Sequence, residues 1–209
     1  MTTISANSTV GIYLSSPSYT NPVAINAGVT ISNCNGYGIG AFVEAWTLQN
    51  SGFITTTTGN GVYLGAGGYS TNAVSSSISG VDGVEITGGI GTVENAGGIA
   101  GNTTSSIGVL LAAGGSVTNQ TGGSISGSTG VDLTAGGTVT NAASASMTGV
   151  YGGVEISGGT GTMVNSGYVA GRGAGGIGVL LGLADRSLMP PQPRSRASRT
   201  AWIFRRAAR

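Results

Sequence analysis

Short alternating runs of apolar and polar residues recur along most of this chain. In residues 130–134, Gly-Val-Asp-Leu-Thr, two apolar side chains lie two positions apart with an acidic residue between them. That spacing is the period of a β-strand with one buried face. Each repeat holds two further runs, one ending at an Asn and one at a Gly, so we predict three short strands per repeat. The predicted core residues of the opening runs are Val62, Leu64, Val84, Ile86, Val109, Leu111, Val131, Leu133, Val154 and Ile156.

The opening runs return at nearly constant intervals. Successive runs begin 22 to 27 residues apart, from Gly11 to Gly178. A period in this range is typical of a solenoid, in which each repeat buries its apolar face only against its neighbours. We therefore predict an all-β fold, a single-stranded parallel β-helix (solenoid) of about 7–8 coils of 22–27 residues.

Asparagine and glycine punctuate the repeats. An Asn follows the opening Gly by 10 to 12 positions in seven successive repeats. Sharp corners need residues with positive φ, which Gly adopts freely and Asn tolerates best. Stacked Asn side chains also form hydrogen bonds along a ladder of strands. The predicted structural ladder consists of Asn72, Asn95, Asn119, Asn141, Asn165, Gly61, Gly83, Gly108, Gly130 and Gly153.

The repeat is clear over residues 38–182 and loose over residues 1–37, which we interpret as irregular N-terminal coils or a cap. Six aromatic residues gather in the first third of the chain. They form either a face that binds sugars or proteins, or the filling of wider first coils that close the end of the solenoid, which we favour. The six are Tyr13, Tyr19, Tyr37, Phe42, Trp46 and Phe53.

Composition excludes several kinds of chemistry. Gly accounts for 41 of 209 residues and charged residues for 7%. Such a composition also occurs in disordered linkers, but the regular apolar spacing argues against disorder here. Cys34 is the single cysteine, which excludes an intramolecular disulfide or a cysteine metal cluster, and the absence of His closes the Ser-His-Asp route. We expect no secretory signal, no transmembrane segment, no metal and no cofactor.

The last 27 residues differ from the rest of the chain. Residues 183–209 carry a net charge of +6 and residues 1–182 a net charge of −5. One interpretation is a basic arm that binds nucleic acid or anionic surfaces. With suitable choices of third bases, however, the codons of the tail can be reread in another frame as GGSVTN and GVDISAGGT, which match residues 114–119 and nearly match residues 130–138. We favour this second interpretation: an Arg-rich disordered tail that is a frame-shifted repeat of a truncated chain, with no nucleic-acid partner.

Asp132 and Glu155 are the candidate catalytic pair. They occupy the same outward position in adjacent coils, which places their carboxylates about 5 Å apart. Such a pair suits a calcium site or the acid and base of a polysaccharide-cleaving enzyme. The alternative, which we favour, is an ordinary outward position, because Tyr63 and Leu110 occupy it in other repeats. Arg172 is the one base in residues 1–182, so a lyase cluster of carboxylates and bases is not expected.

The pattern G-V-x-[IL]-x-x-G-G-x-V-x-N-x-x-x-x-x-I-x-G, clear over residues 38–182, resembles the passenger repeats of bacterial autotransporter proteins and related β-strand-repeat adhesins. The resemblance implies export across the outer membrane and a location at the cell surface or outside the cell. It implies a family that contains adhesins, proteases and inert stalks. The signal peptide and translocating barrel of that family are not found in this sequence, which agrees with truncation.

We therefore expect a non-enzymatic β-helical stalk or adhesive segment of a surface or secreted protein. Its partners would be glycans or proteins on host or neighbouring cells, bound by long ladder faces. Two alternatives stay open: a polysaccharide-degrading β-helix that uses Asp132 and Glu155, and a non-functional gene fragment, which would aggregate through its exposed last coil.

Overall fold

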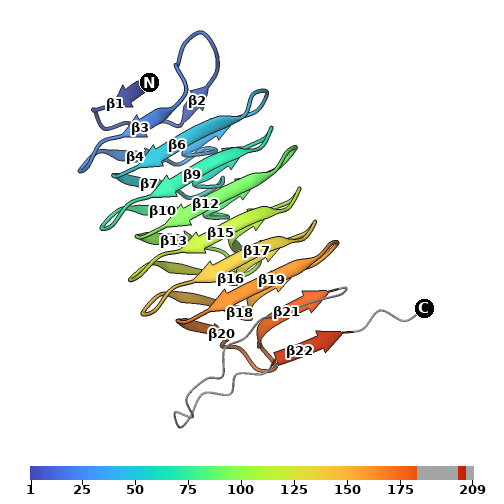
Figure 1. The fold of residues 1–209 in the computed structure, drawn as a ribbon. Coiled ribbons are helices and arrows are strands. Elements are labelled where there is room, and N and C mark those ends of the chain that lie inside the picture. The colour runs from blue at the N-terminus through green and yellow to red at the C-terminus, as the bar shows by residue number, and fades with distance from the viewer. Residues whose placement is uncertain (183–201, 206–209) are drawn as a thin grey trace.

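The computed structural model describes residues 1–182 and 202–205 of the chain. These residues form β-strands and turns without any helix, and each strand pairing between them is parallel. Successive coils stack along one axis into a rod (Figure 1). The predicted parallel β-helix is therefore confirmed.

The first sheet contains eight strands, one from each successive winding. Neighbours in this sheet are separated in the sequence by the rest of a coil, as a solenoid requires. With strands about 4.8 Å apart, eight of them span roughly 35 Å. The strands, in their order in the sheet, are β1 (Thr2–Ile4), β3 (Val23–Ile25), β6 (Trp46–Asn50), β9 (Gly68–Asn72), β12 (Gly91–Asn95), β15 (Gly115–Asn119), β17 (Gly137–Asn141) and β19 (Gly161–Asn165).

The second sheet receives two runs from each coil, so it forms two of the three sides of the rod. One side holds the opening runs and the other the closing runs that end at Gly. The opening strands are β2 (Ile12–Leu14), β5 (Ile39–Ala41), β8 (Val62–Leu64), β11 (Val84–Ile86), β14 (Ile107–Leu111) and β21 (Ile177–Gly182). The closing strands are β4 (Thr30–Asn33), β7 (Phe53–Thr56), β10 (Ser77–Gly80), β13 (Gly98–Gly101) and β20 (Tyr168–Gly171).

Two long strands depart from the prediction of three separate strands per repeat. β16 (Ser124–Leu133) and β18 (Ser146–Ile156) each continue from a closing run into the next opening run. The two are paired along both runs, with a register shift between Gly127 and Thr129. The chain thus passes the corner as extended backbone with a local irregularity, where other coils break the strand with a turn.

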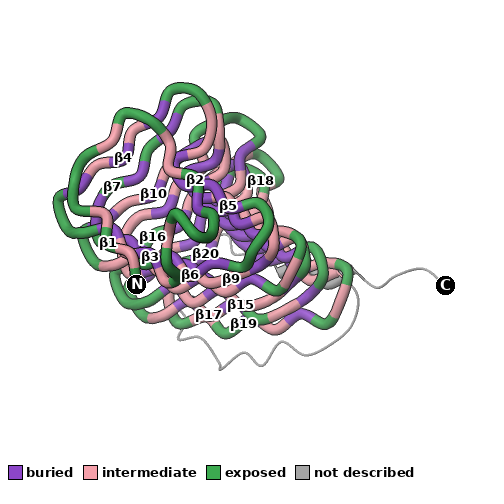
Figure 2. Tube along the Cα trace, turned by 90° about the horizontal axis from the view of Figure 1, so that it is seen from above, coloured by how far each residue is buried: buried purple, intermediate pink, exposed green. Residues whose placement is uncertain are grey.

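The interior of the rod is a continuous apolar column. Each of the ten predicted core residues has no exposed surface. Ile78, Ile99 and Ile125 of the closing runs, and Val93 and Val117 of the first sheet, are buried from the other two sides. Viewed along the axis, the buried positions line the inside of every coil and the turns lie outside (Figure 2). Alternation along each strand therefore decides which side chains enter the core.

The two ends of the chain were expected to be less regular than its middle. Residues 1–37, predicted as irregular first coils or a cap, contribute β1 to β4 to the same two sheets. In the predicted disordered tail, residues 202–205 form β22 (Trp202–Arg205), which pairs in parallel with β21. The edge of β21 thus pairs with these four residues as one further strand. The frame-shift interpretation concerns residues that otherwise lie outside the described part of the chain.

Within the described residues, no helix is long and apolar enough to span a lipid bilayer.

Candidate functional site

A column of asparagine side chains runs through the inside of the rod. Each Nδ2 donates a hydrogen bond to Oδ1 of the Asn one coil further on, at 2.8 Å from Asn72 to Asn95 and from Asn95 to Asn119. The column begins at Asn50 and continues through Asn141 to Asn165. Its members also bond backbone groups of the adjoining turn, as Asn95 does with Gly97. The column thus satisfies buried polar groups, and its role is structural.

The asparagines have ordinary φ values, so the prediction that Asn corners use positive φ was wrong, and the five opening glycines have ordinary φ values too. The opening glycines are required by close stacking instead. A Cβ on Gly83 would lie 2.5 Å from the carbonyl oxygen of Gly108, and the other four are similarly crowded. Positive φ occurs one turn later, at residues such as Gly115 and Gly137. The four other crowded glycines are Gly61, Gly108, Gly130 and Gly153.

We call the outward middle residues of the opening strands the outer ladder. They lie in register on adjacent strands along one side of the rod, and all except the buried Gly40 are half-buried or exposed. The outer ladder changes from aromatic residues at the N-terminal end to acidic residues further on. Its members are Tyr13, Gly40, Tyr63, Glu85, Leu110, Asp132, Glu155 and Leu180.

Asp132 and Glu155 are directly paired across β16 and β18. Burial, and to a lesser extent the neighbouring Glu155 charge, raises the pKa of Asp132 to about 6. Its Oδ1 atom is buried without a hydrogen-bond partner. Leu110 and Leu180 flank the pair on the adjacent strands. The arrangement keeps a carboxyl group ready to hold a proton near neutral pH, which is what an acid catalyst needs.

A second acidic group lies nearer the N-terminus. Asn60 Nδ2 donates a hydrogen bond to Glu85, and the Asp82 carboxylate accepts one from the Ile107 backbone at 2.7 Å. Burial raises the pKa of both carboxyls, and the Asp82 charge adds to the effect on Glu85. Each carboxylate already has a protein partner, so this group serves the turn between coils.

The described residues do not form a cluster of side chains that could bind a metal ion. No three His, Cys, Asp or Glu side chains gather closely enough there to hold an ion. Arg172 stacks 5.7 Å from the Tyr168 ring on the closing side. Within residues 1–182, the one base therefore lies on the closing side and not on the outer ladder.

The six aromatic residues of the N-terminal third separate into different environments. Trp46 is buried and Tyr19 packs against the core, as fillers of the first coils. Phe53 is exposed on the closing side. The remaining three join Tyr63, which sequence reasoning had not included, in a partly exposed cluster on and beside the outer ladder. The cluster consists of Tyr13, Tyr37, Phe42 and Tyr63, with ring centroids of neighbouring members 4.9 to 6.0 Å apart.

No protein family, curated protein or solved structure is significantly similar to this chain.

Proposed function

We propose that this chain is a non-enzymatic β-helical stalk or adhesive segment of a bacterial surface or secreted protein of autotransporter-like type. The observation that supports this most directly is the continuity of the rod: one apolar column and one asparagine column connect its coils. A body of this shape separates whatever lies at its two ends, and it offers the same outward positions in coil after coil. The resemblance of the repeat pattern to passenger repeats supports the extracellular location.

The proposed contact surface is the outward face of the first sheet. Its side chains are mostly hydroxyls, and one column of them runs in register across β12, β15, β17 and β19. Hydroxyls on a regular sheet present donors and acceptors at about 4.8 Å intervals, which suits polar partners that extend along the rod. That column consists of Thr92, Ser116, Thr138 and Thr162.

Adhesion of the full chain coupled to beads tests the proposal. The targets are a panel of immobilised polysaccharides and extracellular proteins. We expect retention on some targets, weakened in the Ser116→Glu/Thr138→Glu variant and unchanged in its matched control, Ser124→Glu/Ser146→Glu on the closing side. Failure to adhere to every target would overturn the adhesive role. A solution-scattering profile of a compact particle rather than a rod would overturn the stalk role.

The raised pKa of Asp132 favours a second candidate, a polysaccharide-degrading enzyme in which Asp132 is the acid and Glu155 the base or nucleophile. Adjacent parallel strands place the two residues about 5 Å apart, within the range of retaining glycosidases. Incubation of the full chain with a polysaccharide panel at pH 5 to 7 tests this candidate. Release of reducing ends that is lost in Asp132→Asn and Glu155→Gln would support it, and no release by the unmodified chain would remove it.

A further inference from the structure

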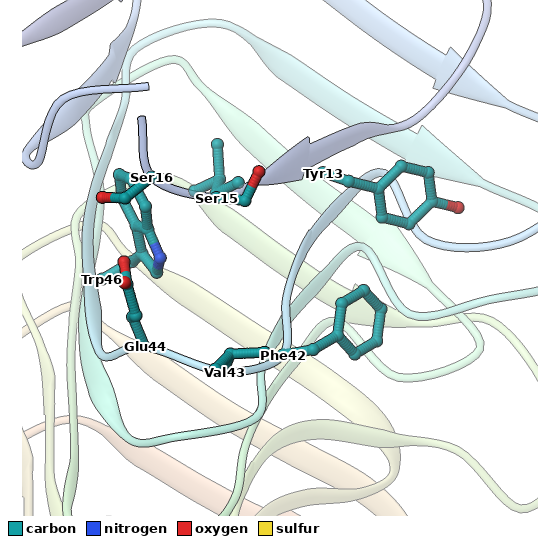
Figure 3. Close-up of a pocket in the computed structure, with 8 residues that line it drawn as sticks. Tyr13, Ser15, Ser16, Phe42, Val43, Glu44 and Trp46 are labelled. Atoms are coloured by element: carbon teal, nitrogen blue, oxygen red, sulfur yellow. The ribbon is translucent and has the colours of Figure 1, made fainter. Parts of the chain in front are cut away.

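A cavity of about 280 Å³ opens between the turns of two adjacent coils near the N-terminal end of the outer ladder. Its upper wall is the Ser15–Ser16 segment that follows β2, and its lower wall is the Phe42–Glu44 segment between β5 and β6 (Figure 3). Tyr13 and Phe42 lie on one side, and Trp46 closes the other (Figure 3). The cavity shares no residue with the hydroxyl column or with the Asp132–Glu155 pair.

The cavity exists because these two turns do not stack as the later turns do. In later coils the equivalent turns are rich in glycine and lie so close that a Cβ on Gly88 would be 2.2 Å from the carbonyl oxygen of Gly65. The turn from Phe42 to Ala45 contains no glycine, and the turn above it extends from Ser15 to Pro22. Longer, bulkier turns stand apart, and the gap between them is the cavity.

Trp46 occupies the first position of its strand, where the later coils have glycine. It pairs in register with Gly68, which begins a glycine column through the first sheet. Its side chain is 2% exposed, and the indole Nε1–H has no hydrogen-bond partner. Figure 3 shows this nitrogen on the edge of the ring that faces the space between the two turns. A buried donor without a partner is rare in folded proteins, and it points to a ligand that accepts a hydrogen bond.

The remaining lining residues define what that ligand must be. The Glu44 carboxylate accepts hydrogen bonds, and the Ser15 and Ser16 hydroxyls both donate and accept them. Tyr13 is 47% exposed and Phe42 49%, and their rings stack with centroids 6.0 Å apart, so an apolar surface borders the polar groups. Exposed aromatic rings beside polar groups favour ligands that have an apolar face and a polar edge.

We propose that this cavity binds a single sugar ring of a glycan. A sugar hydroxyl accepts a hydrogen bond from Trp46 Nε1–H and donates one to Glu44, while the carbon face of the ring lies against Tyr13 or Phe42. A quaternary ammonium group would suit the aromatic rings and Glu44, but it cannot accept the indole hydrogen bond. The volume of about 280 Å³ is slightly below the roughly 300–1,000 Å³ of usual ligand pockets, which suits one sugar ring inside the cavity.

Tryptophan fluorescence of the full chain tests this proposal. The chain has two tryptophans, so the Trp202→Phe background leaves Trp46 as the sole reporter. Titration with glucose, galactose, N-acetylglucosamine and choline should give a saturable change with at least one sugar and none with choline. Calorimetry then measures affinity in Trp46→Phe, which keeps a ring and removes the N–H, and in Glu44→Gln. We expect each variant to bind roughly three- to tenfold more weakly, the size of one lost hydrogen bond.

Phe53→Ala is the matched control, because it removes an exposed aromatic ring from the closing side and should leave the affinity unchanged. Glu44 is exposed, so its variant tests the cavity even if a Trp46 variant fails to fold. Absence of binding to every sugar, tighter binding of choline, or equal binding by Glu44→Gln would each overturn the proposal. Because the cavity is separate from the hydroxyl column, each of these results would leave the bead-adhesion experiment to decide the proposed function.

Discussion

Asn95 Nδ2 donates a 2.8 Å hydrogen bond to Oδ1 of Asn119, which lies directly opposite it on the next coil. The same nitrogen also reaches backbone oxygens at Gly97 and Ser124, and both asparagines have no exposed surface. Each side chain therefore connects its own turn to the neighbouring coils. Since a solenoid is held together mainly by contacts between adjacent coils, these bonds contribute directly to its cooperativity.

Replacing Asn95 by Ala should lower the free energy of unfolding by about 2–4 kcal/mol, because it leaves buried partners on two coils without hydrogen bonds. Urea unfolding followed by circular dichroism measures the loss. Asn102→Ala, at an exposed turn residue, is the control and should change stability by less than about 0.5 kcal/mol. Equal effects of the two substitutions would contradict a structural role for the column.

Three glycine substitutions separate close stacking from backbone conformation. Gly115 has a φ of 135°, and a Cβ added to it would lie only 1.9 Å from the carbonyl oxygen of Gly91. Gly115→Ala should therefore lower the free energy of unfolding by about 3 kcal/mol or more. Gly122 has a φ of 80° in open space, so Gly122→Ala should cost about 1 kcal/mol. Gly98 has neither constraint, and Gly98→Ala should be neutral or slightly stabilising. Thermal unfolding ranks the three, and an equal cost at Gly115 and Gly122 would remove the stacking argument.

Ser70 interrupts the apolar column of the first sheet. It lies between Leu48 and Val93 in register, and its buried Oγ has no hydrogen-bond partner. Ser70→Val should therefore raise the free energy of unfolding by about 1–3 kcal/mol, because it removes an unpaired polar atom and adds apolar contact. Ser76→Ala is the opposite case, since Ser76 Oγ donates a 2.7 Å hydrogen bond to Asn72, and it should destabilise the fold. Destabilisation by Ser70→Val would show that the site cannot hold the larger side chain.

Stability should fall as the pH rises through the range set by Asp132. The pKa of its carboxyl is 3.8 in the reference state and about 6 in the folded chain, so the folded state binds more protons between these values. The free energy of unfolding is then highest below pH 4 as far as this group is concerned, decreases up to about pH 6, and is constant above it. With solvent screening taken into account, the decrease should be about 1–2 kcal/mol.

Urea unfolding at several pH values measures this dependence in three chains. Asp132→Asn should remove the decrease and stabilise the fold at pH 7. Glu155→Gln should reduce the decrease only in part, because burial is a larger cause of the raised pKa than the Glu155 charge. A wild-type profile that is flat or rises between pH 4 and pH 6, with no difference in Asp132→Asn, would contradict the assignment.

The architecture follows from local properties of the sequence. Val131 and Leu133 lie two residues apart, and this spacing alone places both on the inner face of a strand. The constant distance between successive opening runs then puts residues such as Asn95 and Asn119 opposite each other, because coils of similar length stack in register. The alternation within a run and the distance between runs can both be seen in the sequence itself. For that reason the sequence predicts the solenoid and the residues of its interior.

The candidate sites depend on how closely the turns of neighbouring coils pack. The sequence of a single repeat does not contain that information. Trp46 was expected to fill a wide coil, and it does, but its unpaired N–H beside a cavity results from two bulky turns that stand apart. The repeat period predicts that Asp132 lies opposite Glu155 on the next coil. The raised pKa of Asp132, about 6, results instead from the burial of its carboxyl group in the folded chain. Strand spacing and alternation thus determined the rod, and only the packing between coils decided where a donor or a carboxyl would be buried without a partner.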